Sequence, residues 1–189
     1  MERSLNRNNI EAAISEYESS IEEIGETISH LRGVSLFQCL KRNQILLGPY
    51  PHVTLFEAAN RIMTDLVILK GVSWLLRTNS FPFDEYLVEY GNEDNNDHDI
   101  SAQKDGKRLI GEAFNVAPSF FQGKKNAMRK KLRASNSNAE FMIILANSDA
   151  IVEDYAPRTL EKEYFVFVDV QSGAGKLLPD NQVNKDVSR

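Results

Sequence analysis

The sequence contains one cysteine, Cys39, among its 189 residues. A single cysteine excludes a disulfide framework, a CxxC redox pair and every multi-cysteine zinc site, and it is typical of a reducing compartment. Histidine is scarce as well, and His30, His52 and His98 have neither the HxxxH spacing nor a nearby cysteine that a zinc site needs. The composition therefore argues against functions based on disulfides or zinc.

Long apolar runs and a secretion signal are also lacking. The longest strongly apolar stretch, residues 66–76, is interrupted by Lys70 and Ser73 and is too short to cross a bilayer. The N-terminus is polar and has no apolar signal core. We therefore expect a cytoplasmic protein with no membrane partner.

An excess of positive charge is absent too, because 22 lysines and arginines stand against 27 acidic residues, for a formal net charge of -5. General electrostatic attraction to nucleic acid is thereby excluded, so any such binding must come from a local patch. The P-loop, GxGxxG and GxSxG motifs are missing. With 42% apolar and 26% charged residues, the chain has the composition of a single globular domain over residues 1–189.

The N-terminal region predicts a long helix over residues 9–32. Its apolar residues recur at alternating spacings of four and three, with glutamates between them, and they are Ile10, Ile14, Tyr17, Ile21, Ile24, Ile28 and Leu31. Such a narrow seam either packs against the chain's own body or pairs with the same helix of a second subunit. The sequence leaves both possibilities open.

The remaining chain alternates between helical and strand patterns. A turn-rich stretch over residues 33–52 precedes a buried helix over residues 55–76, which begins behind the capping box of Thr54 and Glu57. Alternation around Tyr86 then predicts a strand, and the Asp-Gly pair at 105–106 predicts a two-residue hairpin turn.

The C-terminal part begins with a second capping box, Ser119 and Gln122, which opens a helix to about Arg133. Buried strands are expected at 141–146 and 164–170, and residues 171–189 are expected to form a loosely held tail. This order predicts an α/β fold, in which helices flank a mixed central sheet.

The hairpin turn fixes which residues face each other across the two strands. If the turn consists of residues 105–106, Asp99 lies directly opposite Glu112, with the two Cβ atoms about 4.5 to 5.5 Å apart. Two facing carboxylates repel unless a cation lies between them, and oxygen ligands suit Mg²⁺. The alternative is that both residues are solvated at a polar hairpin edge and pair with Arg108 or a helix lysine.

Small or apolar residues on the other face of the hairpin support this register, because they fit against a core. They are Ile100, Ala102, Leu109, Gly111 and Ala113.

Six cations without an acid follow the hairpin within ten residues: Lys124, Lys125, Arg129, Lys130, Lys131 and Arg133. A phosphate backbone is the partner that such a cluster suits, although basic runs also form solvated helix faces and interact with the helix dipole. Because this helix leaves the strand that carries Glu112, we favour the phosphate interpretation. The predicted DNA contacts are Gln122, Lys124, Lys125, Arg129, Lys130 and Lys131.

One hairpin arm carries Asp99-Ile100 and the other carries Glu112-Ala113-Phe114, and a basic helix and a strand follow. This arrangement resembles the PD-(D/E)XK nuclease superfamily. This superfamily includes many type II restriction endonucleases, and the resemblance covers about residues 54–170. It implies an αβββαβ core, Mg²⁺ held by Asp99 and Glu112, and hydrolysis of a DNA phosphodiester by an activated water.

Two positions depart from the family's pattern. His98 stands where the family often has proline, and Phe114 stands where its catalytic lysine is expected. Since some members supply the lysine from the following helix, Lys124 or Lys125 is the candidate substitute.

We therefore expect a homodimeric, Mg²⁺-dependent endonuclease that cuts double-stranded DNA. Glu57 is a further possible metal ligand, although its capping position favours a structural role, and His98 is a possible contact at the edge of the site. The alternatives are a non-catalytic DNA-binding or assembly protein on the same fold, and a protein that interacts through its N-terminal seam without nucleic acid.

Overall fold

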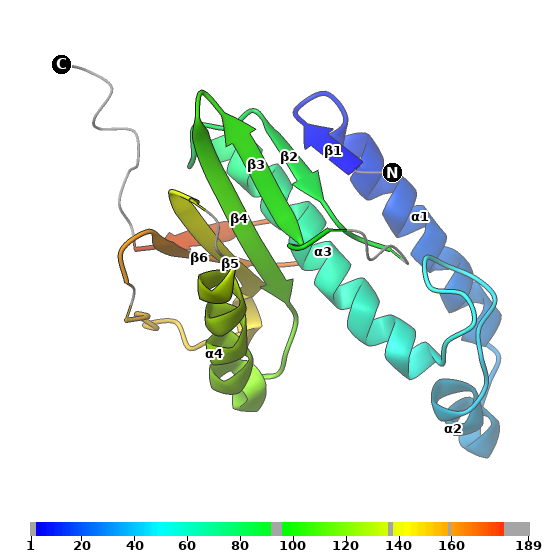
Figure 1. The fold of residues 1–189 in the computed structure, drawn as a ribbon. Helices are drawn as coiled ribbons and strands as arrows, with labels where there is room; N and C mark the ends of the chain where they lie inside the picture. The colour runs from blue at the N-terminus through cyan, green and yellow to red at the C-terminus, as the bar shows by residue number, and fades with distance from the viewer. Residues whose placement is uncertain (1–2, 92–95, 136–137, 159, 180–189) are drawn as a thin grey trace.

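The computed structural model describes residues 3–91, 96–135, 138–158 and 160–179, and a seven-stranded sheet forms its centre (Figure 1). The strands, in sheet order, are β1 (Arg3–Asn6), β2 (Glu85–Val88), β3 (Ile100–Lys104), β4 (Lys107–Phe114), β5 (Phe141–Asn147), β6 (Glu163–Val168) and β7 (Gly175–Leu178). Neighbours from β1 to β4 pair antiparallel, β4 to β6 pair parallel, and β7 is antiparallel to β6. The predicted mixed sheet in an α/β fold is thereby confirmed.

The described residues form four α-helices, and one of them packs on each face of the sheet. They are α1 (Ile10–Ile28), α2 (Gly33–Lys41), α3 (Leu55–Thr78) and α4 (Pro118–Ala134). Figure 1 shows α3 behind the sheet and α4 in front of it, and the buried apolar residues accordingly divide into two clusters, one on each face. From α3 to β5 the elements follow the order αβββαβ. None of the helices in the described ranges is long and apolar enough to span a membrane.

Helix α3 is the central helix that the sequence predicts. The Thr54 side chain accepts a hydrogen bond from the Glu57 backbone N–H at 3.3 Å, so the predicted N-cap is confirmed. The helix ends where Asn79 adopts a left-handed conformation, which frees the chain to turn toward β2.

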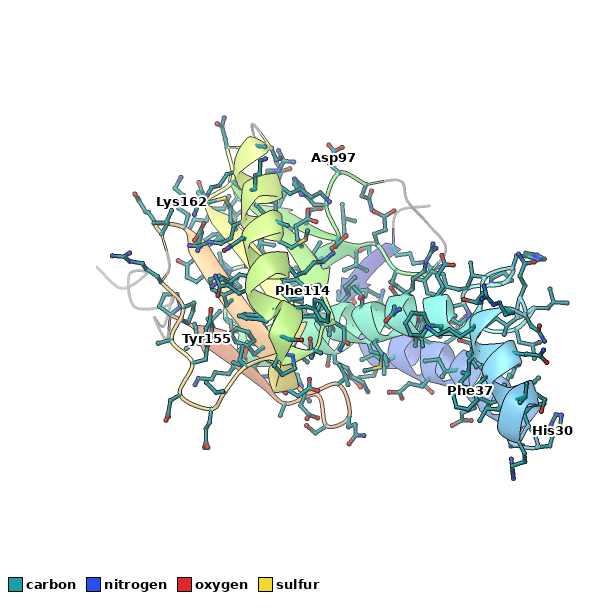
Figure 2. All side chains as sticks on the ribbon, turned by 90° about the horizontal axis from the view of Figure 1, so that it is seen from below. His30, Phe37, Asp97, Phe114, Tyr155 and Lys162 are labelled. Atoms are coloured by element: carbon teal, nitrogen blue, oxygen red, sulfur yellow. The ribbon has the colours of Figure 1, made fainter. Side chains whose placement is uncertain are left out.

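The apolar seam of α1 packs within the chain. Ile10, Ile14, Tyr17 and Ile24 are buried in the core cluster that includes α3. In the described structure, the seam thus packs against the chain's own core. Helix α1 ends at Ile28, earlier than expected, and α2 forms inside the stretch interpreted as turn-rich; Figures 1 and 2 show α2 at the end of the molecule remote from the sheet.

The hairpin register agrees with the prediction. Ile100 pairs with Gly111, and Lys104 pairs with Lys107. The residues expected on the core face lie on the side of α3, where Leu109 and Ala113 are buried. Glu112 consequently points to the opposite face, toward α4.

Helix α4 connects the parallel strands β4 and β5, and it begins one residue earlier than predicted. Pro118 occupies its first turn, Ala117 is the N-cap residue, and no side chain caps the helix. The capping box of Ser119 and Gln122 is therefore wrong, because a proline that presets φ starts the helix before Ser119. At the other end of the chain, β7 forms in the segment expected to be loosely held, and residues 180–189 lie outside the described residues.

Candidate functional site

Asp99 and Glu112 come together where β3 begins beside β4. Asp99 directly precedes β3, and its carboxylate Oδ2 accepts a hydrogen bond from the Ala113 backbone N–H at 2.7 Å. The last pair between β3 and β4 is Ile100 with Gly111, and beyond it the Asp99 side chain accepts the hydrogen bond from the β4 backbone. This contact holds the carboxylate against the strand that carries Glu112.

Glu112 lies inside β4 and is only 1% exposed. Its Oε1 lies 2.8 Å from His98 Nδ1, and its Oε2 accepts a hydrogen bond from Lys131 Nζ at 2.7 Å. A buried carboxylate needs such partners, because an unpaired buried charge is strongly destabilising. The two contacts fix the orientation of the Glu112 carboxylate from the loop before β3 and from α4.

The electrostatics of Asp99 indicate that the two carboxylates share one site. The pKa of Asp99 is raised to about 6 because burial and, after it, the negative charge of Glu112 raise it, and the Ala113 N–H and Lys131 offset only part of the rise. The second oxygen, Oδ1, makes no hydrogen bond with any residue in the described ranges. Asp99 therefore retains an open oxygen beside a second acid.

His98, which the sequence placed at the edge of the site, is buried within it. His98 Nε2 lies 2.9 Å from the Ser135 hydroxyl, and His98 Nδ1 faces Glu112 Oε1. Because an ionised carboxylate only accepts hydrogen bonds, Nδ1 is the donor in a bond to ionised Glu112. Ser135 is the C-cap residue of α4. No sequence signal marked Ser135, since a single serine after a helix carries no periodicity.

The lysine that contacts Glu112 is Lys131, which the sequence assigned to DNA binding. Because α4 joins two parallel strands, it runs back along β4, and its later turns return to the level of Glu112. Lys124 is exposed and makes neither an ion pair nor a hydrogen bond with the described part of the chain. Neither Lys124 nor Lys125 contacts Asp99 or Glu112.

Lys125 instead belongs to a separate cluster at the start of α4. Its Nζ donates to Gln122 Oε1 at 3.0 Å and to the Tyr155 hydroxyl at 2.9 Å. Phe114, at the position where the resemblance expects a lysine, is buried and packs on Phe121 with 5.9 Å between ring centroids. The Phe114 and Phe121 rings form an apolar contact next to Glu112, and Lys125 lies beside Phe121.

Two cations of the basic run, one of them a predicted DNA contact, are engaged within the fold. Arg129 Nε donates to Glu163 Oε2 at 3.1 Å, and Arg133 Nε donates to Glu163 Oε1 at 3.0 Å. Burial alone would raise the pKa of Glu163, but these hydrogen bonds outweigh it and lower the pKa. Arg129 therefore ties α4 to β6, whereas Lys130 remains exposed without a hydrogen bond or an ion pair to the described residues.

Glu57 lies away from Asp99 and Glu112. It forms an ion pair with Arg61 at 2.7 Å in the first turns of α3, which covers the other face of the sheet. Its backbone N–H bonds Thr54, as its capping position predicts.

Candidate metal ligands are limited to the two carboxylates on the hairpin. Among the described residues, no group of three or more histidine, cysteine, aspartate or glutamate side chains is arranged to hold a metal ion. Mg²⁺ binds proteins through one or two carboxylates and keeps several waters, so Asp99 and Glu112 match its usual ligand number.

Comparisons with known proteins identify no relative of this chain: no family model matches it, and neither a curated protein nor a solved structure matches it significantly.

Proposed function

We propose that the chain is a Mg²⁺-dependent endonuclease that hydrolyses phosphodiester bonds of double-stranded DNA, as type II restriction enzymes do. The observation that carries the proposal is the meeting of Asp99, just before β3, with Glu112 in β4, with the Lys131 ammonium 2.7 Å from Glu112. Two carboxylates and an amine supply ligands for a hard cation and a positive group for a phosphate.

The two carboxylates fit a divalent cation. Asp99 has an open oxygen, and its pKa is raised by burial and by the negative charge of Glu112 beside it, which a bound cation would offset. Asp99 Oδ1 and the Glu112 carboxylate would hold Mg²⁺. When bound, Mg²⁺ lowers the pKa of a bound water and stabilises negative charge on the transferring phosphate.

Other residues of the chain orient this pair. His98 holds Glu112 Oε1, and Ser135 holds His98, so the Glu112 rotamer is fixed before substrate arrives. The Lys131 side chain is 48% exposed, and its ammonium, which has three N–H groups, lies 2.7 Å from Glu112 at the solvent-facing side of the pair. Because it carries a positive charge beside the two carboxylates and is partly exposed, we assign to it the role of stabilising a phosphate oxygen or orienting the attacking water, which the resemblance gives to a lysine at the position of Phe114.

Exposed lysines of α4 provide phosphate contacts on the same side of the helix. Lys124 and Lys131 are seven residues apart, which is about two turns and about 10 Å along the axis. A DNA strand lying along this edge of α4 would meet Lys124 and then Lys131. A homodimer, which two-fold symmetric DNA sites favour, must use a surface other than the α1 seam.

A second candidate function is favoured by one specific observation. Ser135, His98 and Glu112 form a chain of hydrogen bonds in the order of a serine-hydrolase triad, with distances of 2.9 and 2.8 Å. In such an enzyme His98 would take the proton from the Ser135 hydroxyl. The same Glu112 cannot serve both functions in the same way, so the two candidates make different predictions.

Substitutions of Glu112 and Ser135 distinguish these candidates. A nuclease loses Mg²⁺-dependent DNA cleavage in Glu112→Gln but retains most of it in Ser135→Ala, and it does not react with a fluorophosphonate. A serine hydrolase is labelled by the fluorophosphonate at Ser135 and hydrolyses a p-nitrophenyl ester without metal. DNA binding without cleavage or labelling would favour the non-catalytic alternative.

A further inference from the structure

Lys125 is a buried lysine without a carboxylate partner. It is 6% exposed, and it forms no ion pair with any residue that the structure describes. Lysines are almost never this buried unless their charge is paired, because removing an ammonium from water is costly. Glu163, an acid that faces α4 from β6, is already shared by Arg129 and Arg133. The buried Lys125 ammonium therefore has no negatively charged partner among the described residues.

Two hydrogen-bond donors remain open at this point. The Lys125 ammonium has three N–H groups, and it uses one on Gln122 and one on Tyr155. The Tyr155 hydroxyl accepts from Lys125, and its own proton has no acceptor among the described residues. Since the Lys125 and Tyr155 polar atoms are 2.9 Å apart, a single group with two acceptor oxygens can take both donors.

The surroundings hold these donors in place. The Tyr155 ring packs edge-to-face on Phe121, with 5.3 Å between centroids, and Lys125 Nζ lies 5.6 Å from the centroid of each ring. Gln122 donates from its amide to Asn126 at 3.3 Å, which turns its oxygen toward Lys125. Exposed Gln122 and half-buried Tyr155 leave a rim open to solvent beside the buried ammonium.

We propose that Lys125, Gln122 and Tyr155 form an oxyanion-binding site for a phosphate group, distinct from the Asp99–Glu112 pair. Phosphate suits the site because its several oxygens can accept from an ammonium and a phenol at once, and charge-assisted hydrogen bonds to it are strong. The assignment of that phosphate to a nucleic acid strand rests on the proposed function. Binding of a free phosphate ion does not depend on it.

Binding in EDTA tests the site without any cleavage. The full chain is titrated with inorganic phosphate, followed by its melting temperature, and with fluorescent 12-nucleotide strands that carry a 5′-phosphate or a 5′-hydroxyl, followed by anisotropy. Lys125→Met keeps the length of the side chain and removes its charge, Tyr155→Phe keeps the ring and removes the donor, and Lys130→Met is the matched control on an exposed lysine of the same helix.

The proposal predicts that phosphate raises the melting temperature of the wild type, and that Lys125→Met weakens strand binding about tenfold or more, as expected for a charged hydrogen bond. Tyr155→Phe should weaken binding about threefold or more, and Lys130→Met by less than either. Tighter binding of the 5′-phosphorylated strand identifies a terminal phosphate, and equal binding identifies the backbone; both support the site. Equal losses in Lys125→Met and Lys130→Met, or no response to phosphate, overturn it.

Two further comparisons keep the outcomes separable. If Lys125→Met fails to fold, Tyr155→Phe carries the test, because it preserves the aromatic packing. If the nuclease proposal is wrong and the anion site is present, wild type and Asp99→Asn bind phosphate equally and neither cuts DNA. If the anion site is wrong and the nuclease is present, Lys125→Met cuts DNA with an unchanged KM.

Discussion

The ammonium of Lys131 lies 2.7 Å from Glu112 Oε2, although the two residues are 19 positions apart in the chain. The strand position where the resemblance expects a lysine carries Phe114, which is buried against α4. The helix that follows β4 thus brings an ammonium to the carboxylate that the strand itself does not provide. We infer that Lys131 performs the role for which the sequence suggested Lys124 or Lys125.

Replacement of Lys131 tests this role. We expect Lys131→Met to lower kcat for DNA cleavage by about 100-fold, the usual effect of removing a positioned acid–base or charge-stabilising group. Lys130→Met is the control, because Lys130 is an exposed neighbour that makes no contact with Glu112. The rates are measured in a plasmid-nicking time course. Equal rates for the two variants would contradict this role, because Lys131 would then contribute no more than the charge of an exposed lysine.

A glycine beside Glu112 is required by the packing of β4 on β5. A Cβ atom at Gly111 would lie 2.5 Å from Ile143 Cγ1 and 3.2 Å from the Ile143 carbonyl oxygen. We expect Gly111→Ala to lower the free energy of unfolding by about 1–3 kcal/mol, the usual cost of overpacking. Gly123→Ala in α4, where nothing lies within 4 Å, should instead stabilise by about 0.5–1 kcal/mol. Urea unfolding measures both, and a destabilisation of the same size in the two variants would contradict this packing account.

We expect Asp65 to make the free energy of unfolding fall as pH rises. It accepts hydrogen bonds from Tyr17, from the Tyr50 hydroxyl at 2.8 Å and from the Gly91 N–H at 2.9 Å. Burial raises the pKa of Asp65, and these hydrogen bonds offset only part of the rise. A raised pKa means that the folded state holds the proton more tightly, so stability is lost as pH rises from about 3.9, the unfolded value, through the folded pKa.

The test measures the free energy of unfolding of the wild type and of Asp65→Asn from about pH 4 to about pH 8, and it compares their difference, wild type minus variant, across this range. We expect this difference to fall as pH rises. A difference that stays constant or grows would mean that Asp65 is not the titrating group.

Glu163 should affect the pH dependence of stability in the opposite direction. Its pKa is lowered, so the stability that it contributes is present above about 4.3, the unfolded value, and is lost as pH falls through the folded pKa. At neutral pH we expect Glu163→Gln to cost about 2 kcal/mol, the range for hydrogen bonds to a charged group. Denaturant unfolding should show this cost shrinking toward acid pH, and a cost that is unchanged at low pH would contradict the assignment.

The sequence predicts the hairpin well because local rules determine it. A two-residue turn fixes the pairing of Lys104 with Lys107, and alternation of polar and apolar residues then selects the face of Glu112. Asp99 follows from the same register, although its side chain bonds the β4 backbone in a way that no pattern indicates.

Other parts of the site depend on tertiary geometry. Which lysine reaches Glu112 is set by the path of residues 115–117 and by the rotation of α4, and a run of six cations does not encode either. Tyr155 and Ser135 are single polar residues in or beside loops, where periodicity carries no information. Helix α2 has apolar residues at Val34, Phe37 and Leu40, but it is nine residues long, too short for its periodicity to distinguish it from the turn-rich stretch that follows.

Cleavage of DNA by the purified chain tests the central claim most directly. Supercoiled plasmid and phage DNA are incubated with wild type, Asp99→Asn and Asp97→Asn, each with Mg²⁺ or with EDTA. Asp97 is the matched control, because it is an exposed carboxylate two residues away that points into solvent (Figure 2). We predict discrete, Mg²⁺-dependent fragments with wild type and Asp97→Asn, and none with Asp99→Asn. Intact DNA with the wild type, or equal cleavage by Asp99→Asn, would contradict the account.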